Sequence, residues 1–177
     1  KSLRETPDVR ISPDDLKIAE NALTYGDKLI RYYMTPRRMI TMISAEEVVG
    51  PVLLDELHKS GFSRLPVYQD NEDVIVGTLH VKSLLNISEA KHGKTVGQVM
   101  QKQAYYVHED LSLAHALKAF LKTKRHLFIV VNQFQEIVGV ITIEDVLEQI
   151  IGQPIIDEFD QYDDLRAVAA LRANEDR

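Results

Sequence analysis

Hydrophobic and polar residues follow one plan twice along this chain. Residues 62–85 and 126–150 each contain a short apolar stretch, a polar turn, a second apolar stretch with Ile-Val-Gly, and the start of a helix. Gly77 and Gly139 hold equivalent places in the two copies. Internal duplication of this kind predicts two half-domains that bury their apolar faces against each other and leave a crevice between them. We expect that crevice to carry the function.

A helical arm is expected before the first copy. Ser12 can cap a helix that starts at Pro13, and Asp15 can complete a capping box. Gly26 is predicted to end this helix. A second short helix is expected over residues 27–34, where the proline that follows Thr35 stops it.

Repeat one is predicted to contain a strand, a helix and two further strands. The helix is expected over residues 45–59, with four apolar side chains on its inner face. These side chains are Val49, Val52, Leu53 and Leu57. The strands are expected at residues 39–43, 65–68 and 74–79, and the polar residues 87–94 are interpreted as a linker.

Repeat two has the clearer pattern. Residues 127–131 and 137–141 are nearly continuous apolar runs, typical of strands that are covered on both faces. Thr142 is predicted to start a helix that Gly152 ends. Another helix is expected to pack one face on a sheet through Leu113, Ala116, Leu117, Phe120 and Leu121.

These patterns predict an α/β (α+β) fold with two βαββα repeats packed in pseudo-twofold symmetry, preceded by a helical arm. The expected domains are the arm at residues 1–30, repeat one at 31–90, repeat two at 95–152, and an acidic tail with a short helix at 153–177.

Composition narrows the class of protein. The chain has 177 residues, 45% of them hydrophobic and 27% charged, which is typical of a globular protein. Its net charge of −6 argues against a general nucleic-acid binder, so the basic residues 37–38 and 122–125 are interpreted as solvated rims. Cysteine is absent, which excludes disulfides, thiol nucleophiles and cysteine metal sites and favours the cytosol.

No apolar run approaches the roughly 20 residues that a membrane-spanning helix needs. The chain does not begin with methionine and carries no signal-peptide pattern. We therefore expect it to be a piece of a longer protein or a chain that has lost its start.

Three motifs are candidates for chemistry, and each has two interpretations. Thr142 and Asp145 form a capping box, or they hold both hydroxyls of a ribose inside the crevice, and the two roles can coexist. Arg64 binds phosphate through its planar guanidinium, or it forms a surface ion pair. Thr35 supplies a hydroxyl at a backbone turn, or it only helps to stop a helix. Pro66 removes a strand hydrogen-bond donor, so its strand is expected at a sheet edge or starting there.

Sequence signatures of catalytic, dinucleotide-binding and metal sites are missing. The chain contains no Walker loop, no dinucleotide-binding glycine fingerprint and no hydrolase elbow. Its six histidines are scattered without metal-ligand spacing, and the tail carboxylates lack the order of a calcium loop. We assign no catalytic or metal-ligating residue.

Taken together, the motifs resemble a tandem pair of CBS domains, and more narrowly the CorC/HlyC and CNNM family of magnesium- and cobalt-transport-associated, hemolysin-like membrane proteins. The resemblance covers about residues 29–160. It rests on residues 34–37, 62–68, 77–82 and 139–150, followed by 157–160.

The resemblance implies a cytosolic pair that follows a transmembrane domain, dimerises, and binds ATP or AMP, often with Mg²⁺. By position, Asp145 and Thr142 would hold the ribose, and Phe62 would enclose the adenine. Arg64, Ser63 and Thr35 would lie toward the phosphates. The full candidate set is Thr35, Phe62, Ser63, Arg64, Pro66, Thr142, Glu144 and Asp145.

Repeat one departs from the family pattern, because Ser83 stands where the family commonly has aspartate. We therefore expect one good nucleotide site around Asp145 and a weak or empty mirror site.

The leading hypothesis is a non-enzymatic, homodimeric regulatory module on the cytoplasmic side of a membrane. It would bind an adenine nucleotide, with Mg²⁺ on the phosphates, and control divalent-cation transport or efflux by the transmembrane domain of its parent protein. No nucleic-acid partner is expected. The alternatives are a constitutive dimerisation scaffold without ligand and the regulatory insert of a soluble enzyme.

Overall fold

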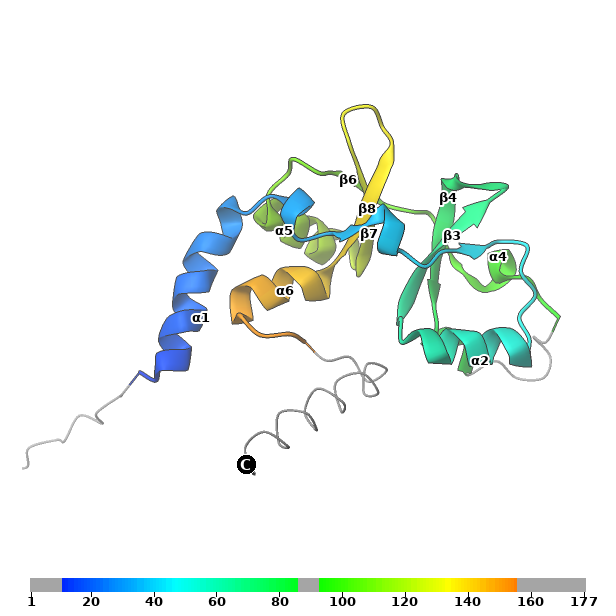
Figure 1. Ribbon diagram of the computed structural model, residues 1–177, viewed down its shortest axis with the longest axis horizontal. Helices are drawn as coiled ribbons and strands as arrows, with labels where there is room; N and C mark the ends of the chain where they lie inside the picture. The colour runs from blue at the N-terminus through cyan, green and yellow to red at the C-terminus, as the bar shows by residue number, and fades with distance from the viewer. Residues whose placement is uncertain (1–10, 86–92, 156–177) are drawn as a thin grey trace, which may run out of the picture.

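The computed structural model describes residues 11–85 and 93–155, which form two four-stranded sheets with helices around them (Figure 1). The first sheet has the order β2 (Ile43–Ser44), β3 (Arg64–Gln69), β4 (Asn71–His80) and β5 (Gln101–Lys102). The second has the order β1 (Thr35–Pro36), β8 (Ile137–Thr142), β7 (Leu127–Val131) and β6 (Tyr106–His108). The predicted mixed α/β fold with two related repeats is confirmed.

The two repeats exchange their leading strands. β1 is the first strand of repeat one in the chain but pairs antiparallel with β8 of repeat two, so that Thr35 lies opposite Val140. In the same way β5 is the first strand of repeat two but pairs antiparallel with β4 of repeat one, so that Gln101 lies opposite Thr78. Each sheet is therefore completed by the strand that leads into the other repeat.

Two glycines make this exchange possible. A Cβ atom on Gly139 would lie 2.6 Å from the carbonyl oxygen of Thr35 and 2.7 Å from the sulfur of Met34. A Cβ atom on Gly77 would collide with the carbonyl oxygen of Gln101 and lie 2.8 Å from the sulfur of Met100. Because only glycine lacks a Cβ, both crossing strands can approach closely. The repeated glycine thus has a packing reason in each half.

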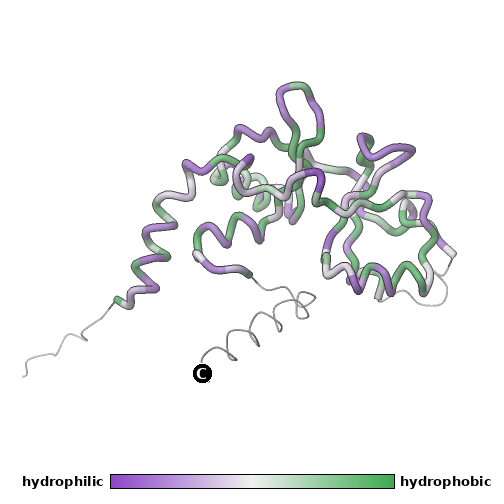
Figure 2. The backbone as a smooth tube through the Cα atoms, in the orientation of Figure 1, coloured by the Kyte–Doolittle hydropathy of each residue, from purple (hydrophilic) through white to green (hydrophobic). Residues whose placement is uncertain are grey.

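Three apolar clusters hold the fold together, and Figure 2 shows hydrophobic residues concentrated along the central strands. Repeat one buries a cluster that includes Leu53, Leu57, Leu65, Val67 and Leu79. Repeat two buries one that includes Ile30, Leu113, Phe120, Phe128 and Val146. A third cluster joins β4 to β7 and β8 through Ile75, Leu127, Ile129, Val131, Ile137 and Val140.

The helices of the arm and of repeat two begin and end largely as predicted. α1 (Pro13–Thr24) starts with the expected capping box, in which the Asp15 amide donates to Ser12 Oγ (3.1 Å) and the Ser12 amide to Asp15 Oδ2 (3.1 Å). Beyond Thr24 the chain continues as a short 3₁₀ turn, η1 (Tyr25–Asp27). α5 (Leu113–Thr123) buries Leu113, Ala116 and Phe120, but Leu121 is exposed, against expectation. α6 (Ile143–Ile151) ends at Gly152, whose φ of 79° is left-handed.

The helix of repeat one is shorter than predicted. α2 (Pro51–Ser60) begins at the proline, and the preceding residues 45–50 are not helical. Their backbone amides bond elsewhere: Ala45 donates to the Tyr68 carbonyl and Val49 to the Lys94 carbonyl, each at 2.8 Å. Val52 was expected to face inward but is 74% exposed. Long-range hydrogen bonds therefore override the helical pattern before Pro51.

The predicted helix over residues 27–34 is also wrong. The segment forms η1 and a second 3₁₀ turn, η2 (Ile30–Tyr32). The Ile30 amide donates to the Leu111 carbonyl at 2.9 Å, and the Arg31 amide to the Glu109 carbonyl at 3.1 Å. The strand expected at 39–43 is replaced by η3 (Arg37–Met39) followed by β2.

Two short helices complete the described chain, α3 (Lys82–Leu85) and α4 (Val96–Val99). Pro66 lies in the interior strand β3, and not in an edge strand as predicted. The neighbouring strand β2 pairs only with the residues that follow Pro66, which are Val67 and Tyr68. Within residues 11–85 and 93–155, no helix has the length and apolar character that crossing a membrane requires. The acidic run and terminal helix predicted in the tail, and most of the linker, lie outside the described residues.

Candidate functional site

The start of α6 carries the main candidate residues. Thr142 is the last residue of β8 and the N-cap of α6. Its amide donates to Asp145 Oδ2 at 2.7 Å, and the Asp145 amide donates to Thr142 Oγ1 at 3.2 Å. The capping interpretation of this pair is therefore confirmed.

Two capping boxes in this chain have the same hydrogen bonds but different surroundings. On the exposed arm helix, the bonds to Ser12 lower the pKa of Asp15 below its usual 3.8. At α6, burial raises the pKa of Asp145 above 3.8, although the bonds to Thr142 oppose that rise. Glu148 and Glu144 add a smaller repulsion in the same direction as burial. Asp145 is thus a partly desolvated carboxylate, a common property of functional groups.

Glu144 connects α6 to repeat one. Its Oε1 lies 3.7 Å from Arg64 Nη1, at the start of β3, and 3.7 Å from His126 Nδ1, just before β7. Arg64 therefore faces the start of α6 across the seam between repeats. The sequence interpretation of Arg64 as an ion-pairing residue is confirmed.

Strand pairing also brings Thr35 toward this place. Thr35 lies opposite Val140, two residues before Thr142 on β8. Phe62 follows α2 and is 43% exposed, so its ring is accessible to a ligand. Ser63 is half-buried, and its carbonyl accepts from the Val81 amide at 3.0 Å. Pro66 is buried in β3 opposite Thr78.

A cavity of about 160 Å³ opens on the seam beside these residues. It is lined by Arg64, Thr78, His80, Gln101, Lys124, Arg125, His126 and Leu127. The solvated-rim interpretation of residues 122–125 fits Lys122, which is exposed, but Lys124 and Arg125 line this cavity. Sequence reasoning missed it because the cavity combines residues from both repeats.

Comparisons with known proteins agree with this architecture. A family model for the CBS domain matches residues 96–152. The solved CBS domain of a bacterial CNNM/CorC family Mg²⁺ transporter, in complex with ATP, has a TM-score of 0.72 and 32% sequence identity, covering 80% of this chain and 99% of that one. The chain belongs to the CNNM/CorC family.

Curated relatives of this CNNM/CorC chain carry two kinds of name. Hemolysin C of Brachyspira hyodysenteriae is 33% identical over 160 residues, covering 90% of this chain and 56% of the relative. The magnesium and cobalt efflux protein CorC of Pasteurella multocida is 33% identical over 151 residues, covering 85% and 50%. The chain spans about half the length of these two relatives.

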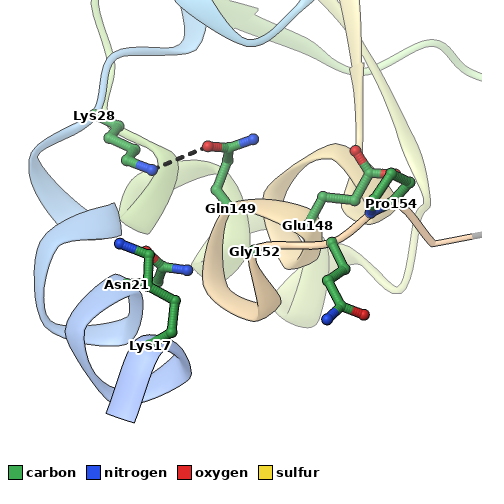
Figure 3. A pocket seen from close by; sticks show the side chains of 8 residues that line it. Lys17, Asn21, Lys28, Glu148, Gln149, Gly152 and Pro154 are labelled. Atoms are coloured by element: carbon green, nitrogen blue, oxygen red, sulfur yellow. Dashed lines mark hydrogen bonds between the residues drawn. The ribbon is translucent and has the colours of Figure 1, made fainter. Parts of the chain in front are cut away.

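A second cavity in this CNNM/CorC chain, of about 370 Å³, lies where α1 meets α6 (Figure 3). Lys28 Nζ donates to Gln149 Oε1 across it at 2.9 Å. At the end of α6, Gly152 lies so close to Asn21 of α1 that a Cβ atom would be 2.5 Å from the Asn21 amide nitrogen. None of the predicted ligand-binding residues lines this cavity.

Proposed function

We propose that this chain is a non-enzymatic regulatory module that binds an adenine nucleotide, ATP or AMP, in the seam between its repeats. The observation that carries the proposal is the state of Asp145. Its carboxylate is partly desolvated, and the described part of the chain supplies no cation that pairs with it. Two ribose hydroxyls would donate hydrogen bonds to this carboxylate and offset its lost hydration.

The neighbouring side chains support a whole nucleotide around that anchor. Arg64 lies across the seam, within ion-pair distance of Glu144, and its planar fork suits a phosphate. Phe62 offers a partly exposed ring for the adenine. Because the chain has a net charge of −6, the phosphates of ATP would enter more easily with Mg²⁺ than without it. Within residues 11–85 and 93–155, no cluster of His, Asp or Glu could hold a metal alone.

The helix that would sense the ligand also contacts the arm. α6 begins at the capping box of Asp145 and ends at Gly152, against Asn21 of α1. A nucleotide that shifts the start of α6 would therefore change its contact with α1. We propose that this change reaches the transmembrane domain of the parent protein from its cytoplasmic side, through a homodimer of CBS pairs, and regulates divalent-cation transport or efflux.

Titration of ATP and AMP, with and without Mg²⁺, tests this function. We expect Asp145→Ala to weaken nucleotide binding by roughly 10- to 100-fold, because charge-assisted hydrogen bonds to the ribose are lost. Isothermal titration calorimetry measures the affinity directly. We also expect Mg²⁺ to strengthen the binding of ATP more than that of AMP.

Asp15→Ala is the matched control, since it removes the same kind of capping carboxylate from α1. Both substitutions remove the capping carboxylate of their helix, but Asp15→Ala should leave nucleotide affinity unchanged. Equal affinity in the Asp145→Ala and unmodified proteins would remove Asp145 from the site. Absence of nucleotide binding by the unmodified protein would instead favour the dimerisation scaffold.

The affinity for the nucleoside should also depend on pH. Ribose hydroxyls bind the ionised carboxylate, and burial raises the pKa of Asp145 above 3.8. Affinity should therefore be full above that raised pKa and should fall as the pH drops through it. Adenosine is the appropriate ligand, because it has no phosphate that titrates, and Asp145→Asn should give a flat pH profile. A profile that is the same in both proteins would contradict this assignment.

The same raised pKa determines how the stability of the ligand-free protein changes with pH. Between the ordinary and the raised pKa, the folded state binds more protons than the unfolded state. The contribution of Asp145 to the free energy of unfolding should therefore grow as the pH falls through this window.

A further inference from the structure

The cavity of about 160 Å³ occupies the place in repeat one that corresponds to the candidate nucleotide site in repeat two. Gln101 lies opposite Thr78 just as Thr35 lies opposite Val140. The Ser63 carbonyl accepts from Val81, and the His126 carbonyl accepts from Ile143, at 3.0 and 3.1 Å. The backbone thus relates the two places closely.

This relation shows which side chains differ. The helices before β3 and β7 both end at a left-handed residue, Gly61 with φ 72° and Lys124 with φ 54°. One residue further, Phe62 in the nucleotide site corresponds to Arg125 in the cavity. The aromatic ring that would stack on adenine is therefore replaced by a guanidinium.

The ribose anchor is also replaced. Ser83 corresponds to Asp145, and its hydroxyl donates to the His80 carbonyl at 2.6 Å. None of the residues that line the cavity is acidic. A nucleoside would find neither a carboxylate for its ribose nor an aromatic ring for its base there.

The cavity instead gathers positive charge. Arg64, Lys124 and Arg125 are cations, and His80 and His126 lie beside them. Glu144 is the nearby counter-charge, 3.7 Å from both Arg64 and His126. This concentration of cations stands out in a chain whose net charge is −6.

Arg125 is held in position for binding. It donates to Gln101 Oε1 at 2.7 Å, and its guanidinium lies 5.3 Å from the centre of the Tyr105 ring. A guanidinium fixed in this way loses little side-chain entropy when it binds an oxyanion.

We propose that this cavity binds a phosphate oxyanion. Its volume of about 160 Å³ is below the roughly 300–1,000 Å³ of pockets for drug-sized ligands, so it suits an inorganic anion or a phosphate tail better than a whole nucleotide. Two sources share this chemistry: free inorganic pyrophosphate, and the outer phosphates of ATP whose ribose lies on Asp145. The free-anion source does not depend on the proposed nucleotide function, whereas the ATP source rests on it.

Calorimetric titration of the full chain with sodium pyrophosphate, at constant ionic strength, tests the proposal. We expect Arg125→Gln to weaken pyrophosphate binding about tenfold or more. The matched control is Lys122→Gln, which removes one positive charge from the exposed face of α5 and should change the affinity by less than about twofold. If Arg125→Gln does not fold, as judged by circular dichroism, Lys124→Asn replaces it, because asparagine tolerates the left-handed backbone.

Three further titrations separate the sources and the two proposals. Asp145→Ala should bind pyrophosphate normally even though it loses AMP. Pyrophosphate binding to both AMP-saturated and ATP-saturated protein supports a free anion, whereas its exclusion by ATP but not by AMP supports the ATP phosphates. No pyrophosphate binding by the unmodified protein, or an equal loss in Lys122→Gln, would overturn the anion site while leaving AMP binding as the test of the nucleotide site.

Discussion

Phe128→Ala is expected to lower the free energy of unfolding by about 3–5 kcal/mol. Phe128 on β7 and Phe120 on α5 are each 1% exposed, and their rings are stacked with centroids 4.0 Å apart and an interplanar angle of 2°. Removing one ring leaves a cavity against the other, which the surrounding sheet and helix fill only partly. A loss of this size is a large part of the stability of a typical domain.

Urea unfolding followed by circular dichroism measures this change through the shift of the midpoint. Phe134→Ala is the control, because Phe134 lies in the turn between β7 and β8 and is 72% exposed. Its substitution should stay within about 0.5 kcal/mol. Similar losses in both variants would mean that the Phe120–Phe128 stack does not anchor the core of repeat two.

Gly139→Ala is the second large expected effect, at about 1–3 kcal/mol of destabilisation. The added Cβ would lie 2.6 Å from the Thr35 carbonyl oxygen, a backbone atom that cannot rotate away. β1 would have to move from β8, and Thr35 would move with it from the start of α6. We therefore expect nucleotide affinity and stability to fall together.

Gly26→Ala is the matched control, because its Cβ would make only an ordinary contact, 3.7 Å from Ala114 Cβ. Thermal unfolding of both variants, with and without AMP, compares the two effects. A Gly139→Ala protein as stable as the Gly26→Ala protein would show that β1 does not need close contact with β8.

The duplication, the second repeat and the capping boxes could be predicted because local chemistry decides them. Thr142 and Asp145 cap α6 through side chains only three residues apart. β7 and β8 are buried strands, and their apolar runs identify them. In each case the signal and the structure involve the same short stretch of chain.

The exchange of β1 and β5 could not be read in this way, because strand pairing joins residues far apart in the sequence. The same holds for residues 45–50 and for η2, where amides bond to distant carbonyls. Ile30 was assigned to the arm, yet its fully buried side chain belongs to the core of repeat two. The periodicity of apolar residues identifies which face of a helix or strand is buried, but not which element packs against that face.

The candidate site could likewise be predicted only in part. Asp145, Thr142 and Arg64 were found from motifs, but the cationic cavity was not. Its signal was present in the alignment of the two repeats, where Arg125 stands in place of Phe62. Only the strand pairings fix which residues are equivalent, because the chain from Val67 to its partner Gly77 is one residue longer than the chain from Val130 to its partner Gly139.

The exchanged leading strands have a consequence for how such a protein can evolve. A gene fragment that encoded either half by itself would produce a sheet without its outer strand, and the bare row of amides and carbonyls would invite aggregation. Recombination that separated the halves would therefore be selected against. The two copies are free to diverge in their side chains, as Phe62 and Arg125 have done, but must be inherited as a single unit.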